Sequence, residues 1–307
     1  MRRSLLVSFF ALVLCCDAIG APRTLSIATW NLEWLVSARS IAALRQQCLA
    51  PQRSRSLPCD VPAKHARNSA DFSRLASYAR KLDADVIALQ EVEDERTARE
   101  VFPGYQFCFT ARRDLQNVGF AIRKGVPFRC GADLVDLSLR DSVRRGASLV
   151  LLPGSPQEIH MLAVHLKSGC SRKPIDSYES ACGTLRRQVP ALEAWIDSQA
   201  EAGRRFAVLG DFNRDLRNER DAPGLWRDLD DHEPAGLRLR NAGEGQPFSN
   251  CVIGQTFTGF IDYIILGGPL ADALLPGSFR HPGYEAADFR RYRLSDHCPV
   301  AVRLRLN

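Results

Sequence analysis

Short apolar runs separated by polar turns dominate the hydropathy pattern of this chain. Residues 24–30 are apolar and β-branched, which predicts a strand. Further strand-like runs cover residues 85–89, 105–110, 118–123, 147–152, 159–165, 206–209, 255–257, 261–266 and 300–304. Apolar side chains recur at helical spacing in residues 71–82 and again in 185–198, where Pro190 is placed to kink the helix.

The order of these elements bears on the fold class. Strands outnumber helices and do not alternate strictly with them, which favours mixed sheets with outer helices over a purely parallel doubly wound sheet. Residues 48–64 are interrupted by three prolines and two cysteines and are expected to form a surface loop. No stretch has the composition of a linker, so we expect one domain over residues 22–307.

The first 21 residues differ in kind from the rest. Arg2 and Arg3 precede an apolar run from Leu5 to Cys16, and small residues follow at positions 18–20. This order predicts a signal peptide over residues 1–21. The run is too short to span a bilayer, which needs about 20 apolar residues. We therefore expect a secreted or periplasmic protein without stable membrane insertion.

Eight cysteines follow the predicted signal peptide, at positions 48, 59, 108, 130, 170, 182, 251 and 298. An even number in an exported chain predicts disulfides. The sequence leaves the connectivity open, and Cys48–Cys59 and Cys170–Cys182 are the simplest pairs. No C-x-x-C pair occurs, which disfavours a zinc ribbon or a thioredoxin-like site.

The net charge of +6 arises from 41 basic and 35 acidic residues. Such a balance suits a polyanionic substrate without requiring one, because a solvated basic surface has the same composition.

Polar residues gather at the ends of the predicted buried strands, and Asp262 lies within one. Alone, each has an ordinary explanation, such as an Asx turn at Asp211 and Asn213. Asp262 is harder to explain in this way, because a carboxylate among Ile261, Tyr263 and Ile264 is costly to bury without a partner. A histidine is its natural partner and becomes a better base for having it.

Together these residues offer metal ligands, a base and phosphate-binding groups. Carboxylate oxygens are hard ligands suited to Mg²⁺, Mn²⁺ or Ca²⁺. An Asp–His pair can deprotonate water, and Asn and Lys side chains can hold phosphate oxygens. A metal, a base and phosphate-binding groups are what the hydrolysis of a phosphate ester requires.

Five short motifs carry a resemblance to a known family. In chain order they are Trp30-Asn31-Leu32-Glu33, Leu89-Gln90-Glu91, Gly210-Asp211-Phe212-Asn213, Ile261-Asp262-Tyr263 and Ser295-Asp296-His297. Their order and rough spacing resemble the signature motifs of the endonuclease/exonuclease/phosphatase superfamily, which includes deoxyribonuclease I, over residues 24–305. The resemblance implies an α+β fold, a four-layer α/β/β/α sandwich of two mixed sheets flanked by helices.

The resemblance also implies roles for single residues. Glu91 would be the main metal ligand, with Asn31, Glu33 and Asp296 near the ion, which is Mg²⁺ or else Mn²⁺ or Ca²⁺. Asp211 would position or activate the nucleophile, and Asn213 would bind the phosphate. His297, oriented by Asp262, would be the base or the imidazole that polarises the phosphate, and His165 would assist the leaving group or contact the phosphate. His165 resembles the second histidine of the deoxyribonuclease I and sphingomyelinase branches, but the sequence shows no acidic partner for it. Lys167 and Arg145 are expected to contact the substrate phosphate.

The substrate is less determined by the sequence. Export, positive charge and arginine pairs such as Arg144–Arg145 fit a monomeric nuclease that binds the backbone of DNA or RNA. The alternatives are a sphingomyelinase-like enzyme or an inositol-phosphate phosphoesterase. A sphingomyelinase would need an exposed apolar hairpin to bind the membrane, and no such run stands outside the predicted core.

Overall fold

The computed structural model describes residues 23–52, 54, 57–217, 219, 224–252 and 254–306. The predicted signal peptide lies outside these residues. Within them, no helix combines the length and the apolar character that crossing a membrane requires.

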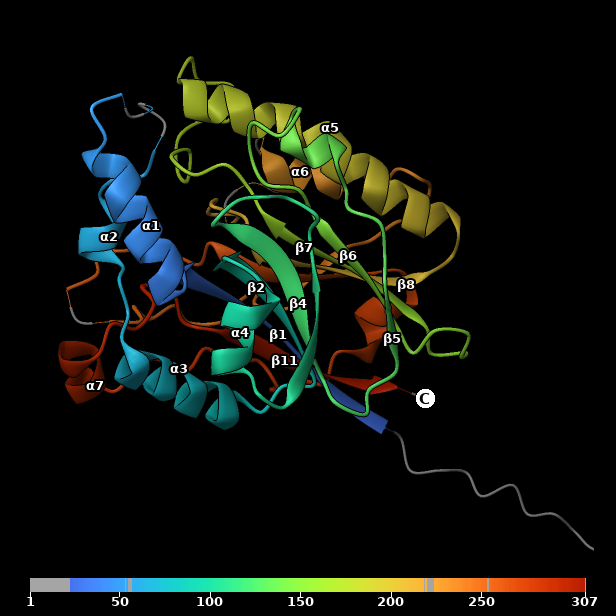
Figure 1. Cartoon of the computed structure of the whole chain (residues 1–307). Helices are drawn as coiled ribbons and strands as arrows, with labels where there is room; N and C mark the ends of the chain where they lie inside the picture. Colours follow the sequence, from blue (N-terminus) through green and yellow to red (C-terminus); the bar gives the residue numbers. More distant parts are fainter. Residues whose placement is uncertain are drawn as a thin grey trace, which may run out of the picture.

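Two mixed sheets lie face to face at the centre of the molecule (Figure 1). The first has the strand order β11-β1-β2-β4-β3, with β1 at Arg23–Leu35, β2 at Val86–Val92, β3 at Tyr105–Phe109, β4 at Asn117–Arg123 and β11 at Val300–Leu306. The second has the order β5-β6-β7-β8-β10-β9, with β5 at Phe128–Cys130, β6 at Ala147–Leu151, β7 at Ile159–His165, β8 at Arg205–Asp211, β9 at Arg240–Asn241 and β10 at Asp262–Gly267.

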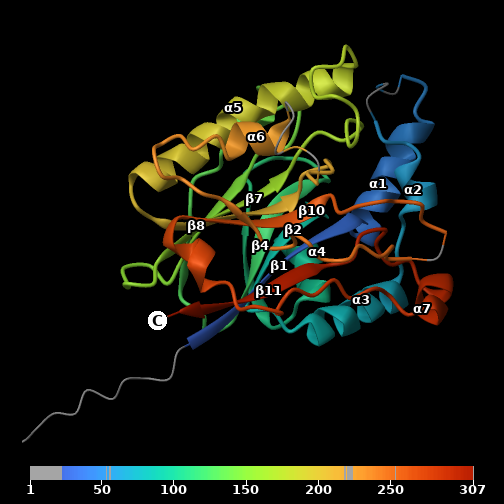
Figure 2. The ribbon, with the colours of Figure 1, turned by 180° about the vertical axis from the view of Figure 1, so that it is seen from behind.

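Helices cover the outer faces of both sheets (Figures 1 and 2). The first sheet carries α3 (Ser69–Leu82) and α4 (Glu95–Val101), and the second carries α5 (Ser180–Glu201) and α6 (Leu225–Leu229). The remaining helices are α1 (Ala38–Leu49), α2 (Val61–Lys64) and α7 (Ala286–Arg291), with 3₁₀ turns at Asp136–Ser138 and Gly268–Ala273. This is the predicted four-layer α/β/β/α sandwich.

Three apolar cores hold the layers together. Leu25 and Ile27 of β1 pack between the sheets with Met161 of β7 and Leu209 of β8. A second core joins one sheet to α3 and α4, and a third joins the other sheet to α5 and α6. Because side chains alternate along a strand, each strand supplies the inter-sheet core with every second residue.

The predicted strands and helices are present with one exception. Residues 255–257 form no strand, and the backbone N–H of Phe257 donates to Oδ1 of Asn250 instead of to a neighbouring strand. The expected loop over residues 48–64 instead contains the end of α1 and all of α2. The pattern also missed the 12-residue helix α1 and several short elements (α4, β5, α6, β9 and α7). The apolar runs of the short elements are too brief to show a period.

Four disulfides join Cys48–Cys59, Cys108–Cys130, Cys170–Cys182 and Cys251–Cys298. They include both pairs expected from the sequence. Arg23 at the start of β1 pairs with Leu306 at the end of β11, so these two ends lie side by side (Figure 2).

Candidate active site

Three predicted site residues form one row across the second sheet. His165 of β7 pairs in register with Asp211 of β8, which pairs in turn with Asp262 of β10. Along its strand, each lies an even number of residues from the side chains that fill the core between the sheets, so it faces the same side. The row therefore points into the space between the sheets, at the position where apolar packing ends.

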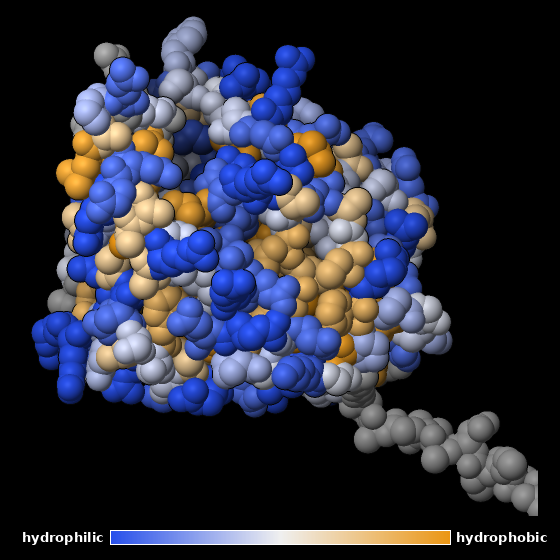
Figure 3. Space-filling model, viewed as in Figure 1, coloured by the Kyte–Doolittle hydropathy of each residue, from blue (hydrophilic) through white to orange (hydrophobic). Residues whose placement is uncertain are grey.

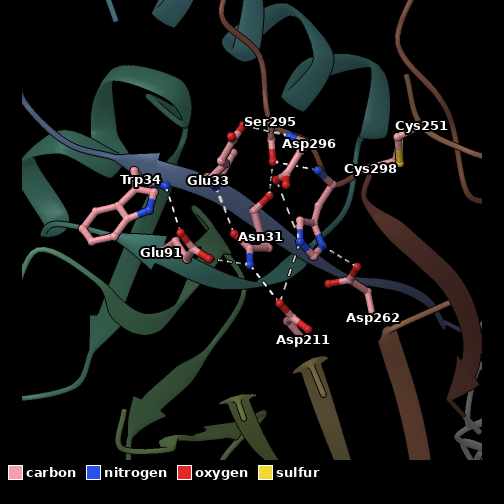
Figure 4. Close-up of polar contacts among 12 residues, drawn as sticks. Asn31, Glu33, Trp34, Glu91, Asp211, Cys251, Asp262, Ser295, Asp296 and Cys298 are labelled. Carbon is pink, nitrogen blue, oxygen red and sulfur yellow. Dashed lines mark hydrogen bonds and ion pairs between the residues drawn. A yellow bond between two sulfur atoms is a disulfide. The ribbon is translucent and has the colours of Figure 1, made fainter. Parts of the chain in front are cut away.

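Asn31 supplies the matching group from the first sheet. It is fully buried on β1, and its Nδ2 donates to Glu91 Oε1 at 3.1 Å and to Asp211 Oδ2 at 3.0 Å. Figure 4 shows Asn31 between these two carboxylates. Its amide oxygen accepts the backbone N–H of Glu33, so Asn31 links the two sheets and orients both acids.

Glu91 reaches the site through an irregularity of β2. By simple alternation it would share the outer face with Ile87 and Leu89. Its φ of 59° and the register shift between Leu89 and Val92 break this alternation. Its carboxylate accepts from Trp34 N at 3.2 Å and from Gln116 Nε2 at 2.6 Å, and it lines the same hollow as Asp211.

His297 and Asp262 form a hydrogen-bonded pair. His297 Nδ1 lies 2.7 Å from Asp262 Oδ2, while its Nε2 lies 3.8 Å from Asp211 Oδ2 and 3.9 Å from Asp296 Oδ1. Burial works against a charged His297, but Asp262, with Asp211 and Asp296, outweighs it and raises the pKa well above the usual value. The structure thus contains the Asp–His partnership expected from the sequence.

The pKa of the second histidine, His165, is shifted in the opposite direction. His165 Nε2 lies 3.5 Å from Asp211 Oδ2 and 3.7 Å from Glu91 Oε1, so acidic neighbours face it that the sequence did not reveal. Burial, with Arg144 and His297, lowers the pKa of His165 well below its usual value. The site therefore favours one charged and one neutral imidazole, a difference that suits separate acid–base roles.

Burial disfavours the charged form of two acidic groups, which a bound cation would stabilise. Burial, followed by the nearby Asp262, raises the pKa of Asp211 to about 7. Burial raises that of Asp296 to about 6, and the neighbouring acids Glu33 and Glu91 add to it. Uncompensated carboxylates of this kind are hard oxygen ligands, so the donor set fits a divalent cation such as Mg²⁺.

The grouping of donors differs in part from the predicted ligand set. Among the described residues, two groups of possible ligands lie within 4.8 Å: Asp211 with Asp262 and His297, and His281 with the disulfide-bonded Cys251 and Cys298. Two of the predicted metal ligands, Glu33 and Asp296, are neighbours in the structure. Oε2 of Glu33 accepts a hydrogen bond from the backbone N–H of Asp296 at 2.9 Å.

The three predicted phosphate contacts separate in the structure. Asn213 lines a hollow of about 460 Å³ together with Glu91, His165, Asp211 and His297. Lys167 lines a neighbouring, larger hollow instead. Arg145 lies outside both, because its guanidinium pairs with Asp141 and Asp133. Its neighbour Arg144 lines both hollows and donates to the carbonyls of His165 and Leu166.

Sequence reasoning also missed Arg67. Its buried guanidinium donates to five carbonyl groups, those of Leu32, Glu33, Trp34, Arg293 and Leu294. It thereby ties the segment after Asn31 to the segment before Asp296, and Glu33 and Trp34 have φ of 45° and 53° there. No local pattern marks an arginine 34 residues from Glu33 as part of the site.

Solved structures resemble this fold at low sequence identity. TDP2 of D. rerio, solved with a single-strand DNA product, is 19% identical, with a TM-score of 0.58 over 91% of this chain and 98% of that one. An endonuclease/exonuclease/phosphatase family protein of Bacteroides thetaiotaomicron is 15% identical, with a TM-score of 0.59 over 94% and 96%. The 3'-5' exonuclease NExo of Neisseria meningitidis is 15% identical, with a TM-score of 0.56 over 92% and 100%.

Comparison of the sequence with models of protein families identifies the family of this chain. No curated protein sequence matches the chain. The model of the endonuclease/exonuclease/phosphatase family matches residues 28–297, which include all five motifs. The chain therefore belongs to the endonuclease/exonuclease/phosphatase family, whose members are phosphoric ester hydrolases that typically depend on a metal ion.

Proposed function

We propose that the chain is an exported, divalent-metal-dependent phosphodiesterase that hydrolyses phosphodiester bonds of DNA or RNA. The observation that carries this proposal is the His297–Asp262 pair, which faces the buried carboxylate of Asp211 within the hollow that Glu91 also lines. An imidazole held by a carboxylate, a buried acid beside it and the amide of Asn213 in one hollow suit the hydrolysis of a phosphate ester.

The residues divide the work by their positions. Asp262 holds the His297 ring so that Nε2 points to Asp211, and the charged imidazole can donate to a phosphate oxygen. Asp211 can position the attacking water and accept its proton, while the Asn213 side chain holds the phosphate. In the reaction the water oxygen bonds to phosphorus as its proton passes to Asp211, the ester P–O bond breaks, and the leaving oxygen takes up a proton from solvent water.

The carboxylates of Glu91 and Asp296, which line the same hollow, would hold the divalent cation. When bound, it polarises the phosphate and neutralises charge that develops in the transition state. Asn31 contributes by fixing Glu91 and Asp211 relative to each other.

Three further observations support nucleic acid as the substrate. The net charge is +6, and Arg144 and Arg172 line the hollow. D. rerio TDP2 was solved with a single-strand DNA product, and NExo is a 3'-5' exonuclease.

Export is supported by the N-terminal segment together with four disulfides, which persist in oxidising compartments.

A substrate panel tests the proposal. Plasmid DNA, RNA, sphingomyelin and an inositol polyphosphate are each incubated with the purified protein in Mg²⁺ and in EDTA. We expect cleavage of DNA or RNA in Mg²⁺ alone, and its loss in His297→Ala, which controls for contaminating nucleases. Hydrolysis of sphingomyelin or inositol polyphosphate with neither nucleic acid cleaved would overturn the proposed substrate.

A further inference from the structure

A second hollow continues from the one that holds the candidate active site. Its volume is about 910 Å³, against about 460 Å³ for the hollow lined by Asp211 and His297. The two share Trp34, Gln116 and Arg144, so they adjoin along these three residues. In Figure 3 a depression is visible beside the part of the surface formed by α1. A substrate no larger than the scissile group would leave this space empty.

The helix α1 forms one wall of this second hollow. Ala43 and Gln47 of α1 line it, as do Leu57 and Pro58 from the segment that follows. The wall has its own small core, in which Ile41 and Leu44 are buried and Trp34 and Leu115 pack against them. The Cys48–Cys59 disulfide closes the segment after α1. The wall thus has a core and a disulfide of its own, and it meets the catalytic hollow at Trp34, whose backbone N–H donates to Glu91.

The lining combines an aromatic ring with positive charge. Trp34 lies at the junction with its ring stacked on His65, the centroids 6.2 Å apart. Arg112, Arg113, Arg144 and Lys167 also line the hollow. Arg113 is exposed and forms no ion pair within the described residues.

The acids in the same hollow are already engaged. Glu93 accepts from Ser37 N at 2.6 Å and from Ser40 Oγ. Asp94 caps α4 through Thr97 N, and Asp114 pairs with Arg112 at 2.8 Å. The donors to Glu93 and Asp94 are neutral and leave their charges in place, but the four cations of the lining outnumber its three acids, so the hollow keeps a net positive charge.

We infer that this second hollow binds a single-stranded segment of nucleic acid that continues from the scissile phosphate. The inference rests on the proposed function and adds to it a preference for polynucleotide over dinucleotide substrates. Cations that follow a phosphate backbone beside an aromatic ring on which an unpaired base stacks are the general means of binding single strands. The volume also lies at the upper end of the range for small-molecule sites, which suits more than one nucleotide.

Two neighbouring alanines of α1 allow a matched test. Ala43 lines the hollow, whereas Ala42 is exposed on the same helix and does not line it. Ala43→Glu and Ala42→Glu change the net charge equally, and Glu suits a helix. Only Ala43→Glu places an anion in the path of the strand. Ala43→Lys places a cation there instead.

Binding is measured in EDTA, so that no cleavage occurs, by the fluorescence anisotropy of labelled oligothymidylate. We expect Ala43→Glu to weaken binding about 10-fold and Ala43→Lys to strengthen it at low salt, while Ala42→Glu binds as the wild type does. In Mg²⁺, the ratio of kcat/KM for the oligonucleotide to that for the dinucleotide TpT should fall about 10-fold in Ala43→Glu and stay unchanged in Ala42→Glu.

Equal effects of the two glutamate variants, or none from Ala43→Glu, would overturn the inference. So would a failure of the wild type to bind the oligonucleotide saturably. The proposed function fails separately, if the wild type binds the oligonucleotide in EDTA but hydrolyses neither DNA nor RNA in Mg²⁺.

Discussion

Nδ1 of His297 lies 2.7 Å from Oδ2 of Asp262, although 35 residues separate them in the chain. Asp262 opens β10 opposite Asp211 of β8, and His297 stands just before β11 of the other sheet. The pair therefore joins the two sheets at the site. It forms only when both sheets are packed.

Asp262→Asn should lower turnover by about 10²–10⁴-fold, because the amide neither supports the charge on His297 nor fixes the ring in the same tautomer. The measurement is kcat with saturating substrate, together with circular dichroism to confirm the fold. Asp272→Asn, at an exposed position, is the matched control and should keep the wild-type rate. A wild-type rate in Asp262→Asn would show that this carboxylate is only structural.

Removal of divalent cations should reduce activity at least about 100-fold, because the phosphate charge and the buried acids then lack compensation. A second readout does not depend on turnover. Mg²⁺ or Mn²⁺ should raise the Tm of the wild type and of Glu100→Gln, but not of Glu91→Gln, since ligand binding stabilises the folded state. Full activity in excess EDTA contradicts the prediction.

Arg67→Ala should destabilise the protein by about 3 kcal/mol or more, because it leaves buried carbonyl groups without a donor. Arg67→Lys should rescue this only in part, since an ammonium group cannot reproduce the planar fork. Urea unfolding measures the loss. Arg45→Ala, which removes an exposed arginine with one long hydrogen bond at 3.5 Å, should change stability little.

The eight cysteines of the described chain should all be oxidised in protein purified from an oxidising compartment. Titration of the unfolded, unreduced protein from residue 22 onward should therefore find no free thiol. Two or more free thiols would speak against this pairing and weaken the proposal of export.

The Cys170–Cys182 disulfide closes a segment at the rim of the catalytic hollow, which Ser171 and Arg172 line. Its removal in Cys170→Ser with Cys182→Ser should cost roughly 3 kcal/mol of stability, since the unfolded chain regains loop freedom. We expect KM for long substrates to rise more than kcat falls on a small phosphodiester. Unchanged KM and kcat for both substrates in a folded double variant would contradict a role in access.

Much of this protein follows from its sequence. Apolar runs at residues 24–30, 159–165 and 261–266 predicted strands of the two sheets, because short apolar, β-branched runs suit strands that are buried on both faces. The same apolar run placed Asp262 inside a buried strand, where it requires a partner. Motif order added the family and the sandwich, and the even cysteine count predicted the disulfides.

Other features arose only from the tertiary structure. The inward turn of Glu91 depends on a left-handed residue and a register shift that no apolar period encodes. Arg145 was predicted to bind phosphate, but in the structure its guanidinium pairs with Asp141 and Asp133. The role of Arg67 became visible only from the five carbonyl groups, distant in sequence, to which it donates. The sequence alone determined which segments are buried, because the apolar runs and helical spacings that mark them are local. The packing of the two sheets decided which polar groups meet, because hydrogen bonds and ion pairs join residues that are distant along the chain.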